Sequence, residues 1–261
     1  MNHIITFNNI ITIISFVVNI TFLIPFILKL YSYFTNKKYI KYVLGFSNEK
    51  VQIKNSTFCL QEPIGVYNNF ITYSSLQSIN NVINLLNIVN QEFNLIDNGQ
   101  ENRNEINIGG FMTNKSVNAY FIKYFKSFKY VTNIKYKNAY DQYPINKQII
   151  EYTSEKFGFK IDNELFLEAG SKISDYAFLI KLTKSDFKDD NEKTVHIIFG
   201  GSDIGTVKAS EYLYTHCKQI YRKYKKNHYF FAIEINRTDE SVNYTKGIID
   251  LTNVMFKDNT Q

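Results

Sequence analysis

The sequence predicts an α/β protein in which one transmembrane helix precedes a domain with a largely parallel sheet and helices on both faces. Three features support this prediction: a long uncharged N-terminal run, an alternation of strand and helix patterns after it, and two glycine-rich junctions between a strand and a helix. Removing the N-terminal run and a short linker leaves about 220 residues, which is the size of one ordinary domain.

The N-terminal run is long enough to cross a bilayer. No charged side chain occurs between Ile4 and Leu28, and four lysines follow between Lys29 and Lys41. A helix rises about 1.5 Å per residue, so roughly 20 apolar residues span a bilayer core of about 30 Å. Because the lysines lie only on the C-terminal side, the positive-inside rule places the rest of the chain in the cytosol. We therefore expect a single-pass cell-membrane protein whose C-terminal domain is cytoplasmic.

Two other interpretations of this run fit the residues less well. A cleaved signal peptide needs a basic start and a small-residue cleavage site, whereas the flank MNHIITFNN carries no lysine or arginine and the exit reads KLYSYFTNKK. A buried core helix would have to place the whole uncharged run inside one small domain. The expected organisation is an anchor and flank in residues 1–36, a linker in residues 37–50 and a cytosolic α/β domain in residues 51–261.

Composition limits the classes of partner and cofactor. The net charge is +6, and much of it lies in the segments KKYIK and YRKYKKNH. Membrane topology explains the first segment, and a short basic helix end such as the second is typically a solvated face, so we expect no nucleic-acid partner. Cys59 and Cys217 are far apart, which fits a reducing compartment. The four histidines share no ligand spacing, so we expect no metal and no cofactor.

Strand and helix patterns alternate along the rest of the chain. A helix is expected after Ser74 or Ser75, because apolar residues from Leu76 to Val89 follow a period of 3.6. A second helix is expected over residues 114–125, and a third after the segment FGGSDIGT. Such an alternation favours a largely parallel sheet. The expected strands are residues 51–54 and 68–73, the segment EINI, a hairpin within 148–169, residues 174–183, the segment TVHIIFG, residues 228–236 and, as a strand or short helix, the tail GIIDLTNVMF.

The chemistry is expected at two junctions, NIGGFMTN from Asn107 to Asn114 and FGGSDIGT from Phe199 to Thr206. Glycine permits positive φ and lets a ligand approach the backbone, and the start of a helix attracts phosphate or another anion. Because ligands bind at the C-terminal ends of parallel strands, neighbouring strands would make both junctions line one pocket. The expected ligand-binding residues are Gly109, Gly110, Thr113, Asn114, Gly200, Gly201, Ser202, Gly205 and Thr206.

The same residues also have a purely structural interpretation. A glycine pair flanked by Asn, Asp, Ser or Thr is ordinary material for a sharp turn into a helix, so Asn114 and Asp203 would then be turn or cap residues. Neither junction fits G-x-G-x-x-G, and neither contains the lysine of G-x-x-x-x-G-K-[ST]. Dinucleotide and P-loop sites are therefore excluded, and the choice between a ligand site and simple turns stays open.

The segment GGSDIGT, followed by a helix, resembles the glycine-rich loop of the Rossmann-like LOG/Smf-type nucleotide-binding superfamily. That loop has a Gly-Gly and a Gly-Thr close together, before a helix with an acidic residue. Here three residues separate the glycine pair from Gly205, and Glu211 falls later than the acidic residue of that superfamily. The resemblance implies a Rossmann-like domain that senses nucleotide-derived signals or cleaves nucleotide N-glycosidic bonds. Some members lie beside transmembrane segments in bacterial defence effectors.

Three functions are expected from these features. The favoured one is a membrane-anchored domain that binds a nucleotide or nucleotide-derived signal and reports it by clustering of its helices, as a homo-oligomer in signalling or defence. The second is a nucleoside or nucleotide N-glycosidic hydrolase or transferase, which needs a carboxylate as nucleophile or base. Its catalytic candidates are Asp203 and Glu211, with Asp175 and Glu168 near predicted strand ends. The third is an anchored protein-interaction scaffold without a ligand.

Overall fold

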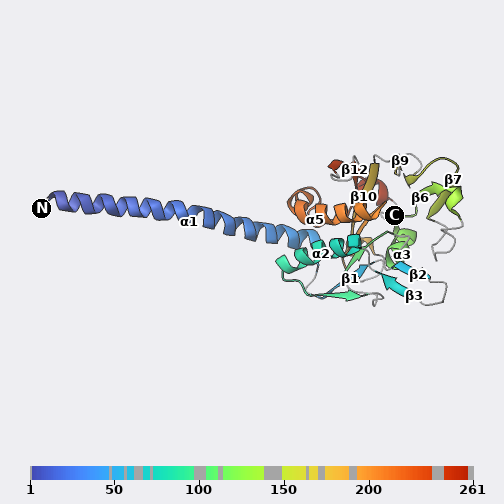
Figure 1. Ribbon diagram of the computed structural model, residues 1–261, viewed down its shortest axis with the longest axis horizontal. Helices are drawn as coiled ribbons and strands as arrows, with labels where there is room; N and C mark the ends of the chain where they lie inside the picture. The colour runs from blue at the N-terminus through green and yellow to red at the C-terminus, as the bar shows by residue number, and fades with distance from the viewer. Residues whose placement is uncertain are drawn as a thin grey trace.

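The computed structural model of the protein shows a long N-terminal helix that leads into an α/β domain (Figure 1). The structure describes the following segments of the chain: residues 2–46, 49–55, 58–61, 67–70, 73–96, 104–110, 114–137, 149–162, 165–169, 174–187, 193–236 and 244–257.

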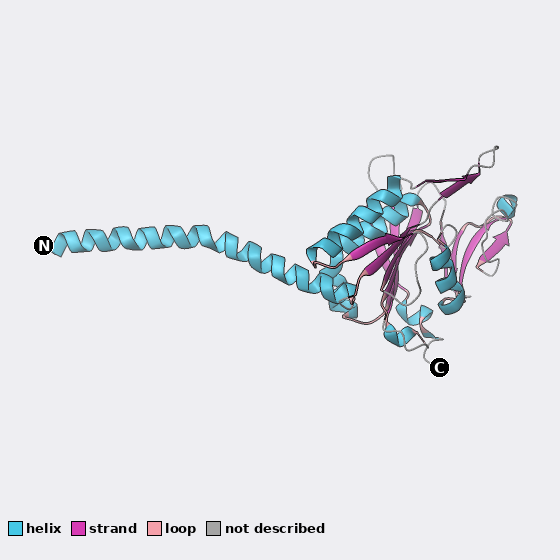
Figure 2. Cartoon of the chain, turned by 90° about the horizontal axis from the view of Figure 1, so that it is seen from below, coloured by secondary structure: helices cyan, strands magenta, loops and turns pink. Residues whose placement is uncertain are grey.

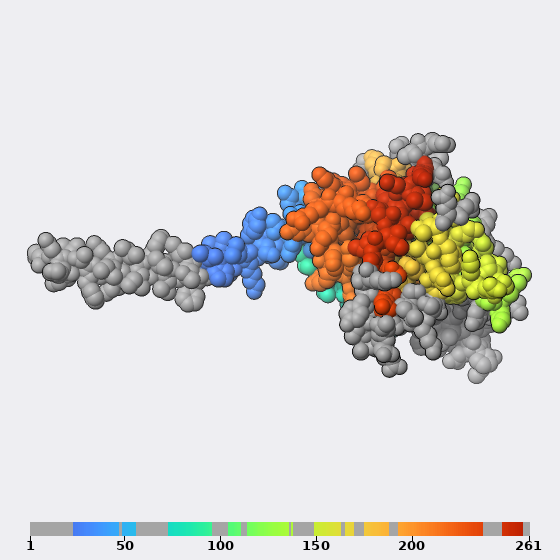
Figure 3. All heavy atoms as spheres, turned by 90° about the horizontal axis from the view of Figure 1, so that it is seen from above, coloured from blue at the N-terminus to red at the C-terminus, as the bar shows by residue number. Residues whose placement is uncertain are grey.

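Helix α1 (Asn2–Leu44) continues through much of the predicted linker. Its C-terminal end packs on the domain through Ile40, Val43 and Leu44, and the preceding part projects away from the domain (Figures 1 and 2). Tyr42 near this end stacks on Tyr221 of helix α5 (Asp203–Tyr224) at a ring-centroid distance of 5.3 Å. Figure 3 shows the end of α1, in blue, beside the orange surface of α5. The attachment of α1 therefore involves only its last turns.

The predicted transmembrane anchor is wrong. Among the residues that the structure describes, no helix combines the length and the apolar character that a membrane crossing requires. The part of α1 whose side chains are described starts at Leu23, and it includes Lys29, Lys37, Lys38 and Lys41. The single-pass location in the cell membrane was expected from the same run, so that prediction is wrong as well.

Seven strands form the main sheet, in the order β13-β12-β10-β11-β5-β1-β4. Strands β4, β1, β5 and β11 are mutually parallel. Strand β10 is antiparallel to both of its neighbours, and β13 is antiparallel to β12. The bounds are β1 Val51–Asn55, β4 Phe93–Ile96, β5 Glu105–Ile108, β10 Ser174–Leu182, β11 Val195–Gly200, β12 Tyr229–Asn236 and β13 Tyr244–Asp250.

The α/β class is as expected, but the sheet is mixed, so the prediction of a largely parallel sheet is wrong. A helical crossover returns the chain in the same direction, and β11 and β12, which flank α5, do run in the same direction. Strand β10 lies between them and runs the other way. It follows strand β9 of a smaller sheet, and β13 follows β12, with no described helix at either connection. The sequence pattern thus predicted the helical crossovers. It did not predict the direction of β10 and β13, which enter the sheet without a described helical crossover.

Helices cover both faces of the main sheet (Figure 2). The end of α1, α2 (Tyr73–Ile88) and α5 (Asp203–Tyr224) pack on one face, with Leu213 of α5 fully buried there. Helices α3 (Lys115–Tyr124) and α6 (Thr252–Met255) and a four-stranded sheet pack on the other face. The remaining elements are β6 Phe128–Asn133, β7 Ile150–Thr153, β8 Gly158–Ile161 and β9 Leu165–Glu168 in the small sheet, the hairpin β2 Phe58–Gln61 and β3 Tyr67–Phe70, and 3₁₀ turns at Ile134–Tyr136 and Lys184–Asp186.

Candidate functional site

The strands that precede the two predicted junctions are neighbours. Strands β5 and β11 are parallel, with Ile108 opposite Ile198, and the Gly109 N–H donates to the Ile198 carbonyl at 2.9 Å. Gly109 has a φ of 100°, a conformation that favours glycine. A Cβ on Gly110 would lie 4.0 Å from the Phe199 ring. Both junctions therefore start from the same edge of the sheet.

Asn114 ties the start of α3 to two strands of the sheet. Its Oδ1 accepts from the N–H groups of Ser116 at 3.0 Å and Val117 at 3.2 Å, which is the N-cap arrangement. Its Nδ2 donates to the carbonyls of Ile108 at 3.1 Å and Lys54 at 3.4 Å. The predicted ligand residue Thr113 lies outside the described residues. Asn114 has a structural role at this junction, because each described hydrogen bond of its side chain goes to backbone.

The start of α5 is held by a buried carboxylate. Ser202 is the N-cap: its Oγ accepts from the Gly205 N–H at 3.3 Å and donates to Oδ2 of Asp175. Oδ1 of Asp175 accepts from the Tyr176 N–H at 2.8 Å, and Asp175 is only 3% exposed. Oγ1 of Thr206 accepts from the Gly200 N–H at 3.0 Å. Asp175 is a negative group at a helix N-terminus, the position at which such a charge is favourable.

The glycines of this junction allow the chain and Asp175 to pack closely. A Cβ on Gly200 would lie 2.4 Å from the carbonyl carbon of Gly205. A Cβ on Gly201 would lie 2.6 Å from Oδ1 of Asp175, and one on Gly205 would lie 3.0 Å from Oδ2. The space at the start of α5 that a phosphate would use is therefore occupied by the protein's own anion. This geometry favours the structural interpretation of the second junction.

The predicted catalytic carboxylates lie apart from one another. Asp203 is exposed in the first turn of α5. Glu211 forms an ion pair of 2.7 Å with Lys208 on the side of the same helix. Of the carboxylates considered from the sequence, Asp175 is the one that the structure brings to the glycine loop.

A group of polar side chains on β1 and β5, which we call the polar face, was missed by the sequence analysis. It consists of Gln52, Lys54, Glu105 and Asn107, each at most 6% exposed. Gln52 lies opposite Glu105, and Lys54 lies opposite Asn107, in the parallel register. All four point to the side of the sheet that α3 covers, because Tyr120 of α3 donates to Glu105 at 3.1 Å.

The polar face is organised around the carboxylate of Glu105. Its Oε1 lies 3.0 Å from the Lys54 amino group. Its Oε2 accepts from Asn107 Nδ2 at 3.2 Å and from the Tyr120 hydroxyl at 3.1 Å. Lys193 in turn donates to the Tyr120 hydroxyl at 3.3 Å. Three donors thus hold one carboxylate in a fixed orientation.

Two acceptors of the polar face have no hydrogen-bond partner among the described residues. They are Oε1 of Gln52 and Oδ1 of Asn107, and both atoms are buried. Leaving a buried acceptor unsatisfied costs about 1–3 kcal/mol, and native proteins satisfy nearly all such groups. These two atoms lie on adjacent parallel strands, with Gln52 opposite the first residue of β5 and Asn107 opposite Lys54. The polar face is therefore the best candidate for a binding surface.

A signal for the polar face was present in the sequence. Strands in the middle of a parallel sheet are normally apolar on both faces. The segments VQIK and EINI instead place a polar residue at every second position. The apolar residues between them, such as Val51 and Ile106, pack on the opposite face. The alternation of polar and apolar residues in two neighbouring central strands was thus the pattern that indicated the polar face. The glycine pairs were easier to notice but did not indicate it.

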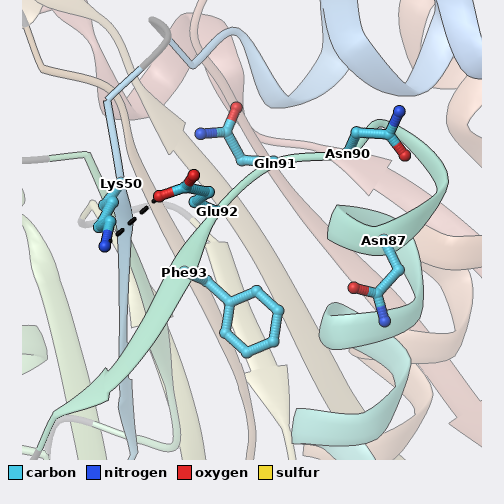
Figure 4. A pocket seen from close by; sticks show the side chains of 6 residues that line it. All are labelled: Lys50, Asn87, Asn90, Gln91, Glu92 and Phe93. Carbon is cyan, nitrogen blue, oxygen red and sulfur yellow. Dashed lines mark ion pairs between the residues drawn. The ribbon is translucent and has the colours of Figure 1, made fainter.

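Two surface hollows lie at the opposite edge of the sheet, around the turn from α2 to β4. One has a volume of about 360 Å³ and is lined by Lys50, Asn87, Asn90, Gln91, Glu92 and Phe93 (Figure 4). The other, of about 310 Å³, shares Asn90, Gln91 and Glu92 with it. The ion pair of 3.4 Å between Lys50 and Glu92 at the first hollow is solvent-exposed. Such a pair contributes little stability or specificity.

A second buried polar group lies on the other face of the sheet, below the end of α1. Nε2 of His196 donates to the Leu44 carbonyl at 2.8 Å, and Nδ1 accepts from the Tyr229 hydroxyl at 3.3 Å. Burial, and then the charge of Lys181, lower the pKa of His196 to about 3, so the imidazole is neutral. Burial also lowers the pKa of Lys181 to about 8, with a further contribution from Lys226. The hydrogen bond from His196 to Leu44 fastens the end of α1 to the domain.

Comparisons with known proteins do not assign the chain to a family. No family model matches it, and neither a curated protein nor a solved structure matches it. Within the described residues, no group of three or more His, Cys, Asp or Glu side chains has a metal-binding arrangement. The candidate site therefore depends on the geometry of the polar face.

Proposed function

We propose that the α/β domain binds a nucleotide-like small molecule on the polar face, beside the start of α3. One observation carries the proposal: the buried acceptors of Gln52 and Asn107 are unsatisfied on adjacent parallel strands, on the face that α3 covers. A ligand with N–H groups would recover the free energy that these acceptors lose on burial. The resemblance of GGSDIGT to the loop of a nucleotide-binding superfamily supports the same class of ligand.

The start of α3 supplies the complementary half of a nucleotide site. The Gly109–Gly110 turn follows β5, and Lys115 is exposed in the first turn of α3. The amino group of Lys115 and the positive end of the α3 dipole favour a phosphate there. The start of α5 is a poorer place for phosphate, because the carboxylate of Asp175 already occupies it.

Binding is better supported than catalysis. Hydrolysis of an N-glycosidic bond needs a carboxylate that reaches the ligand. Glu211 is held by Lys208, and Asp175 is engaged by Ser202 at the cap of α5. The carboxylate of Glu105, the one on the polar face, is held by three donors, which suits recognition better than nucleophilic attack.

Thermal unfolding of the full chain in the presence of a panel of nucleoside monophosphates and triphosphates tests the proposal. A ligand that binds only the native state raises the melting temperature, and the rise increases with the logarithm of its concentration above the Kd. We expect at least one nucleotide to raise the melting temperature of the wild-type chain and to have a smaller effect on Gln52→Met.

A matched control uses another buried polar group without a described partner, the hydroxyl of Thr132. Thr132 on the small sheet is fully buried, and its Oγ1 has no partner among the described residues. Thr132→Val removes a similar polar atom away from the polar face, so it should keep the ligand response. The proposal is overturned if no nucleotide shifts the wild-type chain, or if Gln52→Met responds as the wild type does.

A further inference from the structure

We propose that a basic surface at the junction of α1 and α5 binds single-stranded nucleic acid through its phosphate backbone. The basic surface consists of five exposed cationic side chains and three tyrosines: Lys38, Lys218, Arg222, Lys225 and Lys226, with Tyr39, Tyr42 and Tyr221. The two helices cover the face of the main sheet opposite to the polar face, so this proposal is independent of the proposed function.

Two segments distant in sequence form the basic surface. Tyr39 and Tyr42, in the last turns of α1, each have a ring centroid 5.3 Å from that of Tyr221 in α5. The end of α1, in blue, lies beside the orange surface of α5 (Figure 3). From the sequence, membrane topology explained the segment KKYIK and a solvated helix end explained YRKYKKNH. The first explanation depended on an anchor that is wrong, and neither explanation accounts for the meeting of the two segments.

Cations from both helices gather at the tyrosine rings. The amino groups of Lys38 and Lys226 lie 5.9 and 4.9 Å from the ring centroid of Tyr42. The amino group of Lys218 lies 5.9 Å from the ring centroid of Tyr39. At such distances a cation is attracted by the face of the ring, so the rings hold these lysines close together at the surface.

The C-terminal end of α5 extends the basic surface. Arg222 follows Lys218 by four residues, which places both on one side of the helix, and Lys225 caps the same end. Lys223 lies on a different side, where its amino group forms an ion pair of 2.7 Å with Asp250. By contrast, no cation of the basic surface forms an ion pair with a described residue.

The charge of the basic surface is not balanced nearby in the sequence. No Asp or Glu occurs from Met1 to Phe46 or from Tyr212 to His228, and these segments hold nine of the 30 Lys and Arg residues. The rest of the chain has 21 Lys and Arg against 24 Asp and Glu, so the net charge of +6 comes from these two segments. Like charges repel, and an external anion that neutralises them relieves this repulsion. The partner is therefore expected to be a polyanion.

Single-stranded nucleic acid is the polyanion that fits both the cations and the rings. Its phosphates pair with exposed amino and guanidinium groups, and its unpaired bases stack on aromatic side chains. Tyr39 and Tyr42 are both partly exposed. A duplex offers phosphates but keeps its bases stacked inside, so it gains nothing from the rings. Contacts to phosphates and ring faces do not distinguish between bases, so we expect binding that tolerates any base sequence.

Fluorescence anisotropy of a labelled oligothymidylate of about 12 nucleotides, titrated with the full chain, tests the proposal. We expect a Kd of about 1–100 μM near physiological salt. Between about 50 and 200 mM salt, the logarithm of the affinity should fall against the logarithm of the salt concentration with a slope of about −3, since four or five phosphate contacts contribute about 0.7 each. A duplex of the same length and vesicles that contain phosphatidylglycerol are the alternative polyanions, and both should bind more weakly.

Two adjacent positions provide a matched pair of variants. Arg222→Gln and Lys223→Gln each remove one positive charge, but only Arg222 belongs to the basic surface. Arg222→Gln should weaken binding about fivefold to tenfold at about 50 mM salt and reduce the magnitude of the slope by about 0.7. Lys223→Gln should keep the affinity and the slope of the wild type. Circular dichroism and the melting temperature of each variant check that it folds.

Three results would overturn the proposal. The first is an oligothymidylate that does not bind at the lowest salt concentration. The second is an equal loss of affinity for Arg222→Gln and Lys223→Gln, which would show that net charge alone matters. The third is binding of the duplex or of the vesicles as tight as that of the single strand, which would assign the basic surface to duplex phosphates or to an anionic lipid surface instead. None of these results affects nucleotide binding on the polar face.

Discussion

The amino group of Lys54 lies 3.0 Å from the carboxylate of Glu105, on adjacent parallel strands, and both side chains are almost completely buried. Such a pair loses the hydration of two charges, so it contributes little net stability compared with apolar side chains of the same size. Removing one partner alone leaves an uncompensated buried charge. The pair is therefore a sensitive probe of the polar face.

Lys54→Met should lower the free energy of unfolding by about 3–5 kcal/mol, because the Glu105 carboxylate then stays buried without its cation. Adding Glu105→Gln should recover part of this loss. Urea denaturation at neutral pH measures both changes. Lys160→Met is the control, because its ion pair with Glu151 is partly exposed and should be worth less than about 1 kcal/mol. A loss for Lys54→Met as small as that of the control would contradict a buried pair.

The neutral state of His196 predicts a specific pH dependence of stability. Its pKa is lowered from 6.5 to about 3 in the folded protein, with burial as the main cause. Between these two values the unfolded chain binds more protons than the folded chain, so the stability due to His196 falls as the pH falls from about 6.5 toward 3. His196→Gln should reduce this dependence between pH 6.5 and 5, where most carboxylates are still charged. Equal slopes in denaturation midpoints for His196→Gln and the wild type would exclude this role, and His216→Gln on α5 provides the control.

Lys181→Met should stabilise the protein at neutral pH. The Lys181 amino group is buried and has no hydrogen-bond partner among the described residues. Replacing it with an apolar side chain of similar length removes an unsatisfied polar group, which is worth about 1–3 kcal/mol. The difference between variant and wild type should shrink as the pH rises.

This dependence of the stability difference on pH follows from the pKa of Lys181. Burial is the main reason that this pKa is lowered from 10.5 to about 8 in the folded protein. The unfolded chain keeps its proton up to the higher value, so the wild type gains stability from Lys181 as the pH rises from about 8 to 10.5. Denaturation midpoints at pH 7 and pH 10 measure the change. A destabilised Lys181→Met chain at pH 7 would show that the amino group has a partner after all.

Gly200→Ala should destabilise the protein, because its Cβ would lie 2.4 Å from the carbonyl carbon of Gly205 and both atoms belong to backbone. Overpacking of this kind typically costs about 1–3 kcal/mol. Gly247→Ala on β13 is the control, since nothing lies within 4 Å of its Cβ position. Thermal unfolding of the two variants compares them. Equal melting temperatures would show that the junction at α5 is not tightly packed.

Much of the local structure could be predicted from the sequence. The apolar period from Leu76 to Val89 corresponds to α2, and Asn114 caps α3 where the second helix was expected. The strand patterns at residues 174–183 and 228–236 correspond to β10 and β12. Strand direction could not be predicted from these patterns, because it depends on the connections, and β10 enters the sheet from the small sheet. Hydrophobicity alone predicted a membrane anchor in α1, which the described residues do not support.

The candidate site was only partly predictable, because its contacts join residues that are distant in sequence. The glycine pairs correctly marked two neighbouring strand ends, because a turn from a strand into a helix needs permissive backbone. What occupies each turn depends on residues distant in sequence. Asp175 reaches the start of α5 from β10, and Glu105 meets Lys54 across the pairing of β5 with β1. A pattern within one segment contains no information about such contacts.

Nuclear magnetic resonance of the side-chain amide groups tests the central claim most directly, since it observes Gln52 and Asn107 themselves. Spectra of the ¹⁵N-labelled full chain, assigned with Gln52→Met and Asn107→Leu, are recorded during addition of the nucleotide that raises the melting temperature most. We predict that the amide signals of Gln52 and Asn107 shift and saturate together, while most other side-chain amides keep their positions. Saturating shifts elsewhere in the spectrum with these two signals unmoved would contradict a ligand site on the polar face.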